Sequence, residues 1–210
     1  MLNSFIRKLK LAFGDPEIRF RIFFLVGALV LFRLLASVPI PGVDKNALAS
    51  FFASNQFFGL LNIFSGGGLS NLSIAMLGVG PYITASIIMQ LGTIIFPQVK
   101  AAYFEEGEAG RAKFIGWSRL FTIPIAILQG IGFLFLLESQ GVITHLGSVA
   151  LVANIALVAA GSMLLMWLGE LVTEFGIGNG VSLIILAGIL ASVPTSLSQT
   201  LFAATAADIP

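Results

Sequence analysis

The chain of 210 residues is 57% hydrophobic, carries charge on only 10% of its residues and has a mean hydropathy of +1.00. Soluble domains are typically about 25% charged, so this composition excludes a water-soluble globular domain and indicates an integral membrane protein. The net charge of +1 identifies no partner, and the lack of cysteine excludes disulfides, thiol chemistry and cysteine-ligated metal sites.

The first 20 residues predict an amphipathic helix in the headgroup layer on the cytoplasmic side, with cations on one face and apolar side chains on the other. A first membrane span is expected over residues 21–41, closed by two prolines. We expect no cleaved signal peptide, because the apolar stretch runs too far and ends in Pro39-Ile40-Pro41-Gly42, a poor cleavage site. Arg33 falls inside this span. We interpret it as snorkelling or helix-paired, with a functional intramembrane charge as the alternative.

Residues 46–99 contain no Asp, Glu, Lys or Arg. This uncharged stretch is too long for one span, which needs about 20 apolar residues. The run is interrupted by a glycine-rich knot, Phe64-Ser65-Gly66-Gly67-Gly68-Leu69-Ser70-Asn71. Irregular backbone at membrane depth is tolerated only where protein buries it or water bathes it. We therefore predict that residues 57–72 enter the membrane without crossing it, and that a full span follows over residues 73–97.

A hydrophilic loop is expected over residues 100–113, and three further spans follow it. They are predicted at residues 116–137, 149–170 and 178–198. The fold class is therefore all-α: a polytopic membrane helix bundle over residues 21–200, with five transmembrane helices and one re-entrant segment. Residues 201–210 are expected to form a tail on the outer side, at a point of truncation.

The positions of the cations indicate how the helices are oriented. If residues 57–72 dip in and return, nine cations face one side and Lys45 alone faces the other. The nine are Arg7, Lys8, Lys10, Arg19, Arg21, Lys100, Arg111, Lys113 and Arg119. A full span at the dip would give five against five. Since Lys and Arg gather on the cytoplasmic side, we expect a cytoplasmic N-terminus and an external C-terminus.

Few residues suggest chemistry. His145 is the only histidine and lies in a predicted outer loop without Asp, Glu or Cys beside it, so we interpret it as a surface residue. Residues 176–180 lack the preceding strand that a dinucleotide loop needs; we expect a backbone turn that begins a helix recessed in a water-filled funnel. Glu138, Glu170 and Glu174 all lie at predicted span boundaries, whereas proton-coupled transporters need buried acids. The sequence predicts no catalytic residue, no metal and no cofactor.

Six motifs follow one another along the chain. They are Pro39-Ile40-Pro41-Gly42, Asn62-Ile63-Phe64-Ser65-Gly66-Gly67, Leu77-Gly78-Val79-Gly80-Pro81-Tyr82-Ile83-Thr84-Ala85-Ser86-Ile87-Ile88-Met89-Gln90, Glu106-Gly107-Glu108-Ala109-Gly110-Arg111, Met166-Trp167-Leu168-Gly169-Glu170 and Gly176-Ile177-Gly178-Asn179-Gly180-Val181-Ser182. In this order they resemble the SecY family, the large subunit of the bacterial-type Sec protein-conducting channel. The family fold has two pseudo-symmetric halves that close like a clam shell. This chain resembles the first half, from about residue 5 to residue 197.

The resemblance implies three groups of functional residues. The aliphatic pore ring would include Val79, Ile83, Val181 and Ile185. The plug that closes the outer side of the idle pore would be residues 57–72, with Asn62, Phe64, Ser65, Gly66, Gly67 and Gly68 as its motif residues. The lateral gate, through which signal sequences leave, would include Ser86, Gln90 and Gln129. Interhelical hydrogen bonding is a compatible reading for the two glutamines.

The resemblance also implies the partners and the location. The partners are SecE-type and SecG-type small membrane subunits, a SecA-type motor ATPase or the ribosome, signal sequences, the lipid bilayer and the missing C-terminal half of the channel. The location is the cell inner (plasma) membrane, with the thylakoid membrane left open. Two other functions stay open. One is a small-solute secondary transporter, which suits broken helices but would need polar ligands; the other is a non-channel membrane scaffold.

Overall fold

The computed structural model describes residues 14–42, 45–54, 58, 62, 65, 67–104, 107–143 and 147–207. Regular secondary structure in these ranges is helical, apart from isolated bridge residues, of which Pro39 and Ser73 pair with each other in an antiparallel bridge. The helices are α2 (Pro16–Leu35), α3 (Lys45–Ser54), α5 (Gly80–Ile95), α6 (Pro97–Phe104), α7 (Gly107–Ser139), α8 (Ser148–Phe175) and α9 (Gly180–Ala207). The expectation of an all-α fold is confirmed for these residues.

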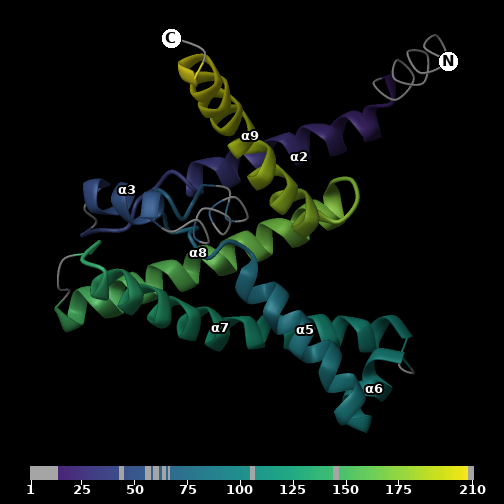
Figure 1. Ribbon diagram of the computed structural model, residues 1–210. Helices are drawn as coiled ribbons and strands as arrows, with labels where there is room; N and C mark the ends of the chain where they lie inside the picture. The colour runs from purple at the N-terminus through teal and green to yellow at the C-terminus, as the bar shows by residue number, and fades with distance from the viewer. Residues whose placement is uncertain are drawn as a thin grey trace.

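The helices form two groups. Helices α5, α6 and α7 contact one another, and α2 and α9 contact each other and α8. Helix α8 also contacts α5 and α7, so it joins the groups, with α5, α6 and α7 on one side and α2 and α9 on the other (Figure 1).

Helix α2 begins at Pro16 rather than at residue 21, because the Asp15 carboxylate caps it. Asp15 Oδ1 accepts the Glu17 N–H at 3.0 Å, and Pro16 fills a first-turn position where no N–H is needed. Arg21 pairs with Glu17 at 2.8 Å and donates to the Gly176 carbonyl at 3.4 Å, at the end of α8. The helix ends at Leu35, before the expected limit at residue 41. Pro39 follows closely, and the residue before a proline, here Val38, disfavours the α conformation.

The segments after α2 and before α5 pair with each other. The Ile40 N–H donates to the Leu72 carbonyl at 2.8 Å, and the Ile74 N–H donates to the Val38 carbonyl at 3.0 Å. Helix α8 packs directly behind this pairing: a Cβ on Gly161 would overlap the Ile74 carbonyl. A buried apolar cluster covers the pairing and includes Ile40, Leu48, Phe51, Leu69, Leu72, Met76, Leu134, Leu137, Val142, Ile143 and Val158.

Several element boundaries differ from the sequence expectations. Helix α5 begins at Gly80 rather than at residue 73, because residues 73–79 form successive turns and Gly78 has a φ of +58°. Helix α3 was not expected. The predicted loop 100–113 is largely helical, since α6 ends at Phe104 and α7 starts at Gly107. The expected outer tail is helical as far as Ala207.

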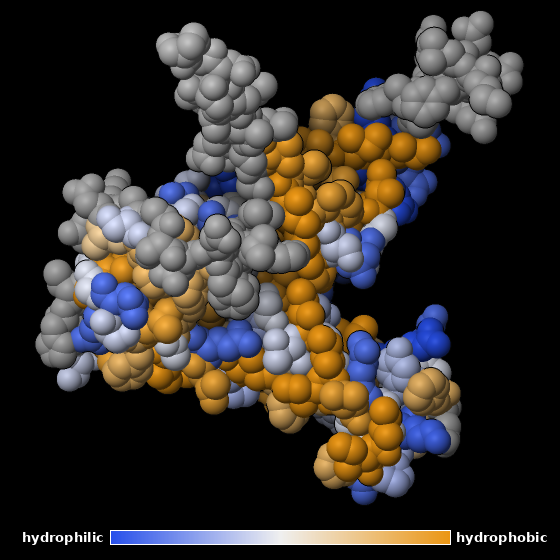
Figure 2. Space-filling model, in the orientation of Figure 1, coloured by the Kyte–Doolittle hydropathy of each residue, from blue (hydrophilic) through white to orange (hydrophobic). Residues whose placement is uncertain are grey.

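Among the described residues, α7 and α8 are long and apolar enough to cross a membrane. Helix α5 and the part of α9 from Gly180 to Ala191 are apolar but shorter. Helix α2 carries Arg19, Arg21 and Arg33 within its 20 residues. Apolar residues cover much of the visible face, and hydrophilic residues gather around α6 and at the start of α2 (Figure 2). Apolar surface of this extent suits lipid contact.

Candidate functional site

Two cavities meet at two isoleucines, Ile83 of α5 and Ile185 of α9. The first cavity, of about 470 Å³, is mainly apolar and is bounded by the glycine-rich knot and by Gln129 and Phe133 of α7. The second, of about 600 Å³, is more polar and lies between α5, α7, α8 and the start of α9. Both isoleucines line both cavities. They therefore form an aliphatic waist between an apolar space and a polar one.

The other two residues of the expected ring lie beside this waist. Val79 is 5% exposed, lines the first cavity and precedes α5, where its carbonyl accepts the Ile83 N–H at 3.1 Å. Val181 lines the second cavity and packs against Gly169 of α8. Val79, Val181 and Ile185 belong to one apolar cluster with Val172 and Ile184. The structure brings the four residues together, with Val79 in a turn rather than inside a helix.

The glycine-rich knot is held by hydrogen bonds that Asn62 accepts. Its side-chain oxygen accepts the Ser70 N–H at 2.7 Å, and its carbonyl accepts the Gly67 N–H at 2.9 Å and the Ser65 hydroxyl at 3.0 Å. Gly67 has a φ of +81°, which favours glycine. Gly68 is crowded, because a Cβ there would lie 3.0 Å from the Ala75 carbonyl oxygen. Phe64 and Gly66 lie outside the described residues, as does His145.

The three residues expected at the lateral gate do not lie together. Ser86 and Gln90 of α5 line the polar cavity, and both also line a third space of about 380 Å³ with Tyr103 and Arg111. Gln129 of α7 instead lines the apolar cavity beside the knot. The residues expected to form one lateral gate therefore line two different cavities.

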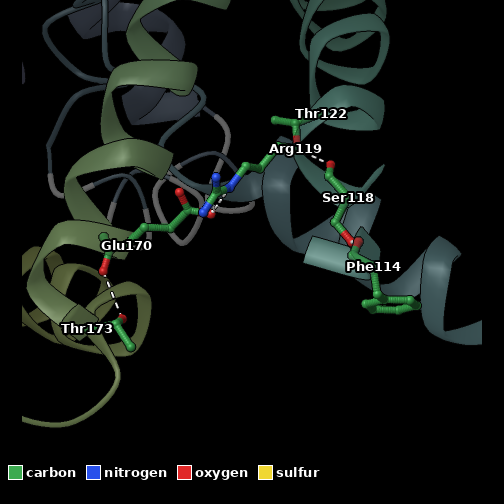
Figure 3. A network of polar contacts seen from close by, with 7 residues as sticks. Phe114, Ser118, Arg119, Thr122, Glu170 and Thr173 are labelled. Carbon is green, nitrogen blue, oxygen red and sulfur yellow. Dashed lines mark hydrogen bonds and ion pairs between the residues drawn. The ribbon is translucent and has the colours of Figure 1, made fainter. Parts of the chain in front are cut away.

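The polar cavity contains an ion pair that sequence reasoning missed. Arg119 Nε of α7 donates to Glu170 Oε1 of α8 at 2.7 Å (Figure 3). Glu170 lies inside α8, not at its boundary, and only 17% of its side chain is exposed. Glu174 and Asn179 also line this cavity. The available signal was the opposite charge of Arg119 and Glu170, but a separation of 51 residues gave no reason to pair them.

The turn at residues 176–180 is built by close backbone contacts. Gly178 has a φ of +76°, and a Cβ on Gly180 would overlap the Gly169 carbonyl. Asn179 Oδ1 accepts the Ser182 N–H at 3.0 Å, and Thr173 Oγ1 accepts the Gly180 N–H at 2.8 Å. The turn therefore starts α9 against α8, at the wall of the polar cavity. In the part of the chain described, no three His, Asp or Glu side chains are grouped to hold a metal.

The arrangement has the fold of solved protein-conducting channels. One match is to Sec61 in the canine ribosome-channel complex from the endoplasmic reticulum, and another is to a structure described as a protein conducting channel. Each has a TM-score of 0.57 and 22% identity, and covers 88% of this chain and 41% of the other. By fold, the chain falls in the Sec61/SecY class of helical membrane proteins.

The sequence comparisons identify the family. The SecY family model matches residues 73–208. The SecY translocase subunits of Buchnera aphidicola subsp. Acyrthosiphon kondoi and of Escherichia coli K12 are each 41% identical over 202 residues, 93% of this chain. The chain belongs to the SecY family. It spans about half the length of these curated relatives, 56% and 45% respectively.

Proposed function

We propose that this chain forms one half of a protein-conducting channel in a membrane, and that it conducts polypeptides rather than catalysing a reaction. The observation that carries the proposal is the aliphatic waist at Ile83 and Ile185 between an apolar and a polar cavity. Aliphatic side chains offer an ion no ligands to replace its hydration shell. They also pack around a passing polypeptide without binding it at one place.

The proposal assigns a task to each part of the site. Ile83, Ile185, Val79 and Val181 form this half of the pore ring. The knot held by Asn62 belongs to a plug that enters from the outer side and turns back. The polar cavity is the cytoplasmic vestibule. Ser86 and Gln90, beside that cavity, and Gln129, beside the apolar one, belong to two parts of the lateral gate. Helices α2, α5, α7, α8 and α9 are then the five transmembrane helices, with the N-terminus in the cytoplasm.

The partners follow from the family and from the geometry of a half pore. A ring with members from α5 and α9 needs a facing wall, which the remaining length of a SecY-type subunit would supply. SecE-type and SecG-type subunits would brace the assembly in the cell inner membrane. A SecA-type ATPase or the ribosome would deliver polypeptides bearing signal sequences. One similar solved structure shows Sec61 in a ribosome-channel complex, which supports the ribosome as a partner.

Ion conductance in planar bilayers tests the proposed waist. We expect the double substitution Ile83→Ser and Ile185→Ser in the assembled channel to raise the resting ion conductance, because the gap between the cavities becomes wettable. Ile88→Ser with Leu186→Ser is the matched control, since these residues lie on the same helices, are 46% and 48% exposed, and line neither cavity. Equal conductance of the two double variants would contradict the assignment.

A transport assay separates this function from the alternatives. Protease-protected secretory precursor should accumulate in vesicles that contain the assembled channel and a motor ATPase. A small-solute transporter would instead show saturable solute uptake without precursor, and a scaffold would show neither activity.

A further inference from the structure

Helices α7 and α8 pack tightly at one end and separate at the other. At the tight end, Leu134 and Leu137 of α7 share the buried cluster with Val158 of α8, and a Cβ on Gly130 would lie 3.9 Å from Val158 Cγ1. At the open end the two helices form walls of the polar cavity, through Ile115 and Arg119 on one side and Glu170 on the other. The pair of helices is thus splayed around the cavity.

The ion pair between Arg119 and Glu170 bridges the open end, 2.7 Å from Nε to Oε1. Glu170 is largely covered, whereas the Arg119 side chain is half exposed. The ion pair of Arg21 with Glu17, by contrast, joins neighbouring turns of one helix. Arg119 and Glu170 therefore connect α7 directly to α8 across the polar cavity between them (Figure 3).

Helix α7 has a weak point just beyond Arg119. Pro124 lies inside the helix and has no N–H to donate to the Leu120 carbonyl. Immediately before it, the Ser118 and Thr122 hydroxyls donate to the Phe114 and Ser118 carbonyls at 3.0 and 2.8 Å, contacts that favour helix bending. This region is therefore the weakest part of α7. A bend here would move the first half, together with α6 packed on it, while the second half stays packed against α8.

We propose that the Arg119–Glu170 ion pair is a strap that sets the width of the polar cavity by restraining the first half of α7. A released strap would let that half swing outward and widen the cavity between α5, α7, α8 and α9. Under the proposed function, on which this last step rests, the strap also sets how readily a polypeptide enters the vestibule. Arg119 and Glu170 act by positioning α7 and do not themselves form the ring.

Distances between spin labels test the strap directly, without reference to transport. Cysteines are introduced at Ala112, in the first half of α7, and at Trp167 of α8, both exposed, in a chain without native cysteine. Glu170→Gln and Arg119→Gln should each enlarge the population at the longer distance. Because an ion pair that is partly exposed to solvent contributes little free energy, we expect this population to grow about two- to fivefold. Glu174→Gln is the matched control, since it removes an acid from the same helix and cavity but not from the pair.

Three further measurements make the result decisive. Exchanging the charges, Arg119→Glu with Glu170→Arg, should restore the short distance, and high salt should lengthen it in the wild type. A label pair at Phe135 and Val152, at the tight end, should stay unchanged in every variant and so report an intact fold. The strap is overturned if Glu170→Gln behaves as Glu174→Gln does, or if the exchanged pair stays as wide as the single variants.

The transport readout is kept separate. Assembled channels with Glu170→Gln or Arg119→Gln should admit precursors with weak signal sequences more readily than the wild-type channel does. If the distances change as expected but no variant or wild type moves any precursor, the strap stands and the proposed function fails. If precursors move but the distances do not respond, the strap fails and the function stands.

Discussion

At the scale of single residues, glycines decide how closely the segments approach. Gly161 of α8 lies against the Ile74 carbonyl, a backbone atom that cannot move aside as a flexible side chain can. Gly169 and Gly180 bring α8 and α9 together in the same way. In contrast, Gly132 of α7 has nothing within 4 Å of the place where a Cβ would be. The same residue type is thus required at some positions and replaceable at another.

Gly161→Ala should destabilise the protein, because the new methyl group forces α8 away from the segment that carries Ile74. Overpacking of this kind typically costs about 1–3 kcal/mol. Gly132→Ala is the control and should be neutral or stabilising by up to about 1 kcal/mol, since alanine favours a helix more than glycine does. Denaturant titrations in micelles measure both free energies of unfolding. Equal values for the two variants would contradict the close contact.

Apolar runs predicted the helices far better than the contacts between them. The runs that became α7 and α8 were visible because long helices in lipid need continuous apolar residues. The bridge between Pro39 and Ser73 was not visible, since backbone pairing across that distance leaves no residue pattern. The Arg119–Glu170 pair was missed because 51 residues separate its two members along the sequence. The ring residues were predicted only through the family motifs, because an i, i+4 spacing of aliphatic residues is commonplace.

At the scale of elements, the turn from α8 to α9 shows how a short loop sets the wall of a cavity. Asn179 caps α9 through its side-chain oxygen, and the Thr173 hydroxyl accepts the next N–H of the turn. Both residues line the polar cavity. The loop that begins α9 therefore also fixes where Val181 and Ile185 lie along the waist.

Asn179→Ala should fray the start of α9, because the Ser182 N–H loses its acceptor. Loss of such a cap typically costs about 1 kcal/mol. Asn179→Asp retains the acceptor and serves as the matched control. Amide hydrogen exchange of Val181 to Leu183 should quicken in the alanine variant and stay near the wild-type rate in the aspartate variant. Unchanged exchange in both would show that the cap does not hold this helix end.

At the scale of the whole molecule, polar turns lie at two ends of the helix bundle. The pairing of residues 38–40 with 72–74 and the turn after α7 lie at one end, where one buried cluster covers both. The start of α2 meets the end of α8 at the other, through Arg21 and Gly176. The segment between α2 and α5 thus returns to the end that it left, as the re-entrant proposal requires.

Impermeant thiol reagents should label single cysteines at Val38 and Asn71 from the same, outer side of the membrane. Both positions are exposed in the structure, whereas the neighbouring Leu72 is fully buried and would react poorly. Gln140 should label from that side also, and Glu174 from the cytoplasmic side. Labelling of Val38 and Asn71 from opposite sides would mean that the segment between them crosses the membrane, and the plug would have to be reassigned.

The pairing between Val38, Ile40, Leu72 and Ile74 also bears on how the protein is made. A chain leaves the ribosome from its N-terminus, so both paired segments exist before any of α8 has been synthesised. Asn154 of α8 donates to the Pro41 carbonyl at 3.3 Å, and Gly161 packs on Ile74 seven residues later. Helix α8 thus packs against backbone carbonyls of segments that are synthesised before it. Its depth in the assembly is set by earlier segments of the same nascent chain.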